Sequence, residues 1–235
     1  WGQNYLADAS GGNNWWSLPL SAKVPHGYEI QKVDEFTTHR VRPTSGAEFI
    51  YSRHFPEEYQ GDFLINNTIG FLGTKQHKVW EDNDGGFTGE LRHDLLHSKD
   101  PNFRPVDLEF APYGSLYIVD WHNPLIGHMQ HSARDPNRDH DHGRVYRITY
   151  PDRPLVKPAK VAGAKIPDLL DNLKLPEYRT RYRTQRELQA RNPEEVLPAV
   201  RKWAAGLDRN DPYYERHLLE ALWATWGHHQ IDEGL

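Results

Sequence analysis

The sequence contains no cysteine among its 235 residues. Within this chain, that absence excludes a disulfide, a zinc site with cysteine ligands, an iron–sulfur cluster and a covalently attached c-type haem. Long apolar runs are missing as well, since none approaches the roughly 18–20 residues that cross a bilayer. We therefore expect no transmembrane segment in this chain. The opening residues WGQNYLADAS read as the middle of a strand, which predicts a fragment of a longer protein.

An excess of positive charge is also missing. The 28 Lys and Arg against 33 Asp and Glu give a net charge of -5, although basic residues cluster locally in RTRYRTQRELQAR (179–191). Nucleic acids are bound through excess positive charge, so we expect no nucleic-acid partner. The sequence also has no Gly-rich phosphate loop, G-x-S-x-G elbow or H-E-x-x-H helix, so the common hydrolase and nucleotide-binding classes receive no support.

What the sequence does contain is a repeated strand signature. Each copy has a glycine, then alternating apolar residues, then Asp or Asn six positions after the glycine. The copies are GQNYLAD (2–8), GDFLINN (61–67) and GSLYIVD (114–120), which start 59 and 53 residues apart. A four-stranded blade needs about this much sequence, so we predict β-propeller blades over residues 1–150, with a β-sandwich as the alternative. EDNDGG (81–86) predicts a hairpin turn, with a calcium site as the alternative.

After residue 150 the composition changes. Residues 151–166 are rich in proline and predict a linker. Residues 167–235 predict helices, with Asn192 and Asp211 as N-caps that precede Pro193 and Pro212. The last of these helices would bury an apolar stripe made of Leu218, Leu219, Leu222, Trp223 and Trp226. Helix pairs of this length are typical of HEAT-like repeats, so we expect the start of a HEAT-like domain.

The most polar segment is DPNRDHDHGR (135–144), which allows three interpretations. Its carboxylate and amide side chains have the spacing of the first ligands of a calcium loop. However, His140 occupies the position where that loop needs glycine, and Tyr146 the position where it needs glutamate. A transition-metal site would instead use His140 and His142 with His122, His128 or His131.

The third interpretation of this segment is structural. Asp135 and Asp139 would cap backbone amides, Arg138 and Arg144 would pair with these carboxylates, and Gly143 would supply the turn into the last strand.

Basic residues precede two predicted strands. His39, Arg40 and Arg42 precede AEFIYS, and Arg104 precedes the strand at 106–110. Such a group suits an anionic ligand, although Arg104 could equally form an ion pair with Asp107 or Glu109.

These segments carry a family resemblance. SGAEFIYSRHFPEEYQGDFLINN, FRPVDLEFAPYGSLYIVDW and HGRVYRITY resemble the end of the quinoprotein sugar dehydrogenases of the soluble glucose and sorbosone type. Together with DPNRDHDHGRVYRIT and the helical segment, they are similar to a bacterial family of large exported proteins described as membrane-bound dehydrogenases. That resemblance implies a propeller, HEAT-like repeats and then a c-type cytochrome domain, in the periplasm or cell envelope.

The resemblance also implies a chemistry. Quinoproteins bind pyrroloquinoline quinone (PQQ) and calcium, and a histidine base helps to move hydride from a sugar to the quinone. Two arginines contact the carboxylates of the cofactor. Arg104 falls on the second of them, whereas Asn102 stands where the first would be. The catalytic histidine would precede Trp1.

Two hypotheses follow. In the first, the chain belongs to a PQQ-dependent sugar or alcohol dehydrogenase that passes electrons to a cytochrome c-type domain or protein. The cofactor would be bound by Arg104, Arg40, Arg42 and His39. A second group at the rim would brace the site or hold a cation such as calcium, and it consists of Asp120, His122, Asp139, His140 and His142. In the second, the chain is a non-catalytic carbohydrate- or protein-binding scaffold, in which Trp15 and Trp16 could stack on sugar rings.

Overall fold

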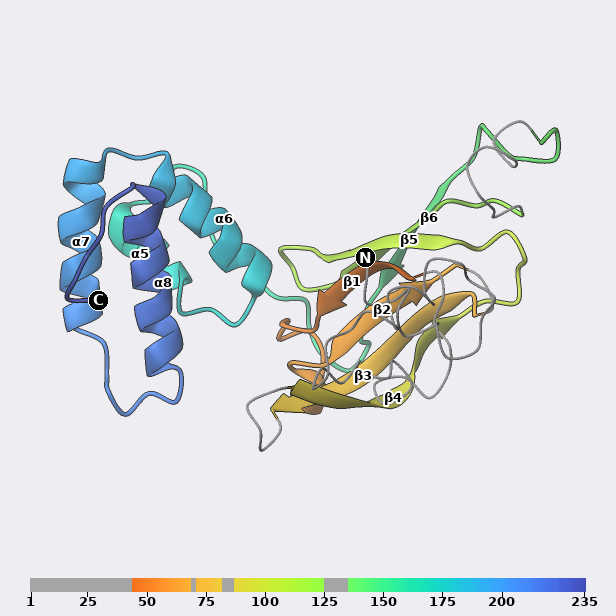
Figure 1. Ribbon diagram of the computed structural model, residues 1–235, viewed down its shortest axis with the longest axis horizontal. Helices are drawn as coiled ribbons and strands as arrows, with labels where there is room; N and C mark the ends of the chain where they lie inside the picture. The colour runs from red at the N-terminus through yellow and green to blue at the C-terminus, as the bar shows by residue number, and fades with distance from the viewer. Residues whose placement is uncertain (1–43, 69–70, 82–86, 125–134) are drawn as a thin grey trace, which may run out of the picture. The chain divides into compact units, whose positions relative to one another are not determined.

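The computed structural model describes residues 44–68, 71–81, 87–124 and 135–235 (Figure 1). These residues divide into two compact units. The first contains the described residues up to Ile50 together with Gly61–Leu108 and Ile118–Tyr146. The second contains Tyr51–Gln60, Glu109–Tyr117 and Arg147–Leu235.

A four-stranded antiparallel sheet is built in chain order from β1 (Thr44–Phe49), β2 (Phe63–Asn67), β3 (Gly73–Glu81) and β4 (Phe87–His97). A 3-10 helix, η2 (Glu57–Tyr59), lies between β1 and β2. Strands β3 and β4 pair along their whole length, from Glu81 opposite Phe87 to Gly73 opposite His97. The hairpin turn predicted for EDNDGG falls on residues 82–86, which lie outside the described part of the chain.

Buried charges in this sheet are paired. Lys75 is 2% exposed, and its Nζ lies 2.9 Å from Asp94 Oδ1. Asp62 is equally buried and accepts a hydrogen bond of 2.6 Å from Arg92 Nε. Because an unpaired charge in such a place would cost several kcal/mol, these pairs hold β4 against β3 and against the residue that precedes β2.

A three-stranded sheet follows, with the order β5 (Pro105–Phe110), β6 (Leu116–Asp120) and β7 (Arg144–Ile148). Leu108, Leu116 and Ile118 are almost fully buried. The turn between β5 and β6 contains Gly114, whose φ of 91° is a conformation that residues with a side chain rarely adopt. The sheet brings the end of β6 and the start of β7 side by side, which positions the candidate site.

The predicted propeller fold is wrong. The described strands form two small sheets with linear strand orders, and no closed ring of blades is present among them. The repeat that suggested blades is real but local. Gly61 and Gly114 both have positive φ, at 84° and 91°, and each leads into a strand that ends in Asn67 or Asp120. A glycine turn before a buried strand is common to many β folds, so it does not specify how sheets close.

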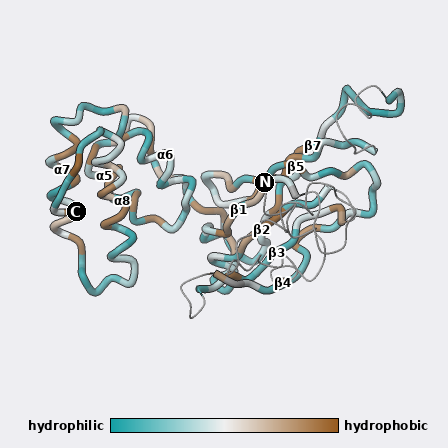
Figure 2. The backbone as a smooth tube through the Cα atoms, viewed as in Figure 1, coloured by the Kyte–Doolittle hydropathy of each residue, from teal (hydrophilic) through white to brown (hydrophobic). Residues whose placement is uncertain are grey.

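Four helices follow: α5 (Ile166–Asn172), α6 (Tyr178–Gln189), α7 (Pro193–Ala205) and α8 (Tyr214–Gly227). Figure 2 shows hydrophobic and hydrophilic residues alternating along these helices, as expected for helices with one buried side. Their shared core includes Leu169, Leu188, Val196 and Val200, all fully buried. None of the helices in the described residues is long and apolar enough to cross a membrane.

The predicted helix starts are correct for α7 and displaced for α8. Asn192 caps α7, since its side chain accepts a hydrogen bond from Glu194 N. Asp211 instead accepts from Tyr213 N, and α8 begins three residues after Asp211. The α8 stripe also differs from the prediction. Trp223 and Trp226 are 44% and 68% exposed.

Candidate functional site

The candidate site lies at the end of β6 and the start of β7. Hydrogen bonds and close polar contacts join five of the predicted residues here, namely Arg104, Asp120, His122, Asp139 and His142. His140 is exposed. The remaining predicted residues, namely His39, Arg40, Arg42, His128, His131, Trp15 and Trp16, lie outside the described part of the chain.

Asp120 is the centre of this group. Its side chain is fully buried at the end of β6. Its Oδ1 accepts hydrogen bonds from the backbone N–H groups of Arg104 (2.7 Å) and His122 (2.8 Å), and its Oδ2 accepts one from Arg144 Nε (2.7 Å). Three donors therefore satisfy this carboxylate, which ties the start of β5, the loop after β6 and the start of β7 together.

Arg104 is committed to main-chain carbonyls. It donates from Nε to Asn123 O (2.9 Å), from Nη1 to Thr68 O (2.8 Å) and from Nη2 to Pro124 O (3.1 Å). Burial is the main cause that lowers the pKa of its guanidinium, opposed by the charge of Asp120. The arginine thus holds two loops in place, and its bonds differ from the predicted pairing with Asp107 or Glu109.

Arg144 is also bonded to carboxylates, although its Nη2 is buried without a hydrogen-bond partner among the described residues. Besides its bond to Asp120, it donates from Nη1 to Asp100 Oδ2 at 2.9 Å. The sequence interpretation paired this arginine with Asp135 or Asp139. Asp100 lies 44 residues away in the chain, so its part in the site could not be seen from local sequence.

Asp139 organises the outer part of the site. Its Oδ1 accepts from the backbone N–H groups of Asp141 (3.0 Å) and His142 (3.1 Å), and His142 Nδ1 lies 2.9 Å from its Oδ2. The Asp141 N–H is the largest cause that lowers the pKa of the Asp139 carboxyl, assisted by His142. The His142 side chain is 72% exposed, so this carboxylate orients an imidazole that is open to solvent. The predicted capping by Asp139 is confirmed.

His122 connects the inner and outer parts. Its Nε2 lies 3.7 Å from Asp139 Oδ2, and its backbone N–H is held by Asp120. Its φ is 52°, which is uncommon for a residue with a side chain and costs of order 1–3 kcal/mol. Its Nδ1 is buried and has no hydrogen-bond partner among the described residues. The bond from its N–H to Asp120 therefore helps to hold the His122 backbone in a strained conformation.

An exposed tryptophan completes the site. Trp121 is 40% exposed, and the Arg138 guanidinium lies 4.8 Å from the centre of its ring. Sequence reasoning did not single out Trp121 as a site residue. Its place directly after the polar end of a buried strand was the available signal.

The calcium and the quinone that the resemblance implies remain predictions, since His39, Arg40 and Arg42 lie outside the described part of the chain. No group of three or more His, Asp or Glu side chains that could hold a metal ion is found among them. PQQ carries three carboxylates and needs cationic donors, whereas Arg104 is bonded to three carbonyls and Arg144 to two carboxylates. No step of a mechanism can therefore be assigned to a quinone at these residues.

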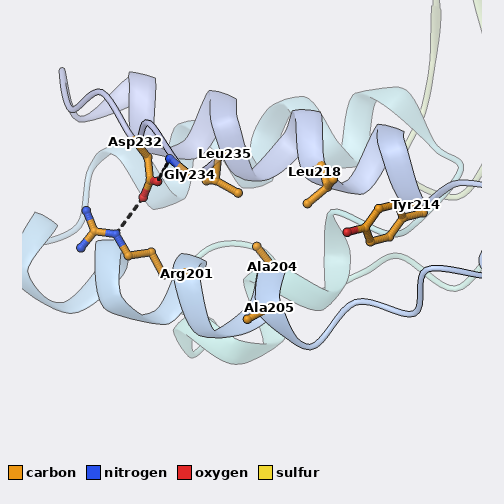
Figure 3. A pocket seen from close by; sticks show the side chains of 8 residues that line it. All are labelled: Arg201, Ala204, Ala205, Tyr214, Leu218, Asp232, Gly234 and Leu235. Atoms are coloured by element: carbon orange, nitrogen blue, oxygen red, sulfur yellow. Dashed lines mark hydrogen bonds and ion pairs between the residues drawn. The ribbon is translucent and has the colours of Figure 1, made fainter.

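The helical part contains a separate small cavity of about 320 Å³ between α7, α8 and the last residues of the chain (Figure 3). Ala204, Ala205 and Leu218 form its apolar wall, and Arg201 and Asp232 meet at one end with a separation of 2.8 Å. The arginine and the carboxylate pair with each other, and the cavity offers both polar and apolar surface.

Comparison with known proteins gives one match. A family model described as "Domain of unknown function (DUF7133)" matches residues 12–152, which is more than half of the chain. No curated protein and no solved structure matches. The matched range contains the whole candidate site, from Arg104 to Arg144. The chain belongs to the DUF7133 family of domains of unknown function.

Proposed function

We propose that the chain is a non-catalytic carbohydrate-binding module whose ligand lies against Trp121 and the Asp139–His142 pair. The observation that supports it is the combination of an exposed indole ring with a carboxylate–imidazole pair on the same loops. Arg138 and His122 link the two parts, since one lies over Trp121 and the other lies 3.7 Å from Asp139.

Sugars suit this surface for two physical reasons. The apolar C–H face of a sugar ring stacks on an indole ring, which is rigid and gives a large contact area. The hydroxyl groups need donors and acceptors that are already held in place, and Asp139 and His142 are held by each other and by backbone amides. Preorganisation of this kind lowers the entropy lost on binding.

Titration calorimetry with glucose, galactose, mannose and their disaccharides tests the proposal. We expect at least one of them to bind, and Trp121→Ala to weaken it about tenfold, because about 1.4 kcal/mol of stacking corresponds to that factor. Trp80→Ala is a matched control, since Trp80 is 41% exposed and also has a cation, Lys78 Nζ, 5.7 Å from its ring centre. Absence of binding, or equal loss in both variants, would reject the proposal.

A second candidate is oxidation of a sugar or related alcohol, as the resemblance to quinoprotein dehydrogenases implies. One observation favours it: if His142 donates from Nδ1 to Asp139, its Nε2 carries a lone pair that can accept the proton of a substrate hydroxyl. The hydride would pass to an acceptor of the quinone class, and a cytochrome c-type partner in the cell envelope would take the electrons. The described residues show no site for that quinone.

Dye-linked oxidation of the same sugars distinguishes the two candidates. With PQQ and calcium added, the binding module is expected to give no dye reduction above a protein-free control. Reduction that is saturable in sugar and lost in His142→Gln would establish the oxidation instead. His140→Gln is the control, because His140 is an exposed imidazole two residues away.

A further inference from the structure

Helices α6 and α8 pack against each other through polar contacts. Arg181 Nε donates to Glu220 Oε1 at 2.7 Å, and Gln185 Nε2 donates to both the backbone and the side chain of Glu220 at 2.8 Å. Further along both helices, Gly227 lies beside Gln189, since a Cβ at Gly227 would be in ordinary contact with Gln189 Cγ at 3.6 Å. These contacts run along both helices and place them side by side.

The exposed side of α8 is apolar. Leu219, Trp223 and Trp226 are spaced four and three residues apart and therefore form one stripe. Their exposed fractions are 40%, 44% and 68%. Ala221 and Ala224 face the core instead. The largest side chains of α8 thus point away from the core that α8 helps to build.

The exposed side of α6 is aromatic and basic. Tyr178 and Tyr182 are 43% and 45% exposed and lie one turn apart. The Arg186 guanidinium lies 6.0 Å from the centre of the Tyr182 ring. Arg183 and Arg186 have no carboxylate partner among the described residues. Both are available to an external anion.

The two stripes lie on one surface. Leu188 of α6 and Ala221 and Ala224 of α8 belong to the same buried core, so the inner sides of both helices face it. Tyr178 and Tyr182 lie one turn before Arg181 and Gln185, and Trp223 lies one turn after Glu220, so both stripes border the contact between the two helices. We call this surface the aromatic face; it consists of Tyr178, Tyr182, Leu219, Trp223 and Trp226, with Arg183 and Arg186 at its edge.

We propose that the aromatic face binds an acidic amphipathic helix of a partner protein. Monomeric proteins rarely expose apolar side chains side by side in this way, and Trp, Tyr and Arg are the residues that contribute most to protein interfaces. Apolar residues of the partner would cover Trp223 and Trp226. Its carboxylates would pair with Arg183 and Arg186, which have no other anionic partner among the described residues.

A fluorescein-labelled 18-residue peptide serves as the probe. It carries leucine at positions spaced three and four apart and glutamate on the flanks, and a second peptide replaces every glutamate by lysine. Fluorescence anisotropy is expected to show saturable binding of the acidic peptide and at least tenfold weaker binding of the basic one. Added salt is expected to weaken the acidic peptide, because exposed charges are screened within about 8 Å at physiological ionic strength.

Variants locate the binding surface. Trp226→Ala, at a side chain that is 68% exposed, is expected to weaken the peptide at least tenfold without changing the far-ultraviolet circular dichroism. Trp80→Ala, in the four-stranded sheet, is the control and is expected to have no effect. The combination Arg183→Gln with Arg186→Gln is expected to remove most of the salt dependence.

Three results would overturn the proposal. They are equal binding of the two peptides, binding that is unaffected by Trp226→Ala, and absence of binding. Sedimentation of the chain alone gives an independent test. A dimer that dissociates in Trp226→Ala would show that a second copy covers the aromatic face, and the partner proposal would then be rejected.

Discussion

Replacing Asp120 by Asn tests whether this carboxylate holds the candidate site together. The side chains have nearly the same shape, so Oδ1 can still accept from the backbone N–H groups of Arg104 and His122. The other oxygen becomes an amide N–H group that faces Arg144 Nε, where a bond of 2.7 Å exists now. The substitution therefore replaces an acceptor by a donor at one buried position.

The expected loss follows from two terms. A hydrogen bond to a charged group contributes about 1.5–3 kcal/mol, and a buried donor without a partner costs about 1–3 kcal/mol. The Arg144 side chain is 32% exposed and keeps Asp100 as a partner, so it regains part of its solvation. We therefore expect Asp120→Asn to lower the free energy of unfolding of the first unit by about 3 kcal/mol.

Asp100→Asn is the matched control. Asp100 binds the same arginine at 2.9 Å, but its side chain is 35% exposed. A surface ion pair contributes about 0–1 kcal/mol, so the two variants are expected to differ by about 2 kcal/mol. Urea unfolding followed by tryptophan fluorescence measures both, and hydrogen exchange of the amides of Arg104 and His122 reports on the site itself. Equal losses in the two variants would show that burial of Asp120 does not carry the effect.

Three further predictions concern the same fold. Arg104→Lys is expected to lower the melting temperature, since one ammonium group cannot replace bonds to three separate carbonyls; an unchanged melting curve would contradict this structural role. Gly114→Ala is expected to lower the free energy of unfolding in urea by about 1–3 kcal/mol more than Gly163→Ala does. Both glycines have positive φ, but of the two only Gly114 has neighbours closer than 3.0 Å to an added Cβ. Equal losses in the two variants would show that backbone strain is the whole effect. Hydrogen bonds from backbone N–H groups, aided by Arg144 and His142, lower the pKa values of Asp100 and Asp139 below 3.8. The stability that these carboxylates contribute is therefore full above pH 3.8 and is lost as the pH falls below it. Melting temperatures measured from pH 6 to 2 are expected to fall less steeply below pH 4 in Asp139→Asn than in the unchanged protein, whereas parallel curves would refute the linkage.

The local sequence predicted individual strands better than it predicted how those strands pair into sheets. The two described glycine-to-Asp or -Asn segments do become strands, because a residue with positive φ, a run of β-favouring side chains and a polar end act within seven residues. How strands join into sheets depends on pairing between distant segments, which a repeated local signature does not contain. The same reasoning explains Arg104. Its three carbonyl partners lie 19, 36 and 20 residues away in the chain. The sequence could therefore single out Arg104 as a site residue, but it could not show that its role is to bond main-chain carbonyls.

Helix α8 shows why a helix can be predicted correctly while its buried side is predicted wrongly. An apolar pattern predicts that the largest apolar side chains will be buried, yet the core of this helix is made by Ala221 and Ala224. Gly227 also lies beside Gln189 of α6. Small residues allow helices to pack at short range, and polar Glu220 is retained inside because Arg181 and Gln185 satisfy it. Trp223 and Trp226 are thereby left outside, where only a further surface can cover them, and this consequence of close packing is what makes the aromatic face a docking surface.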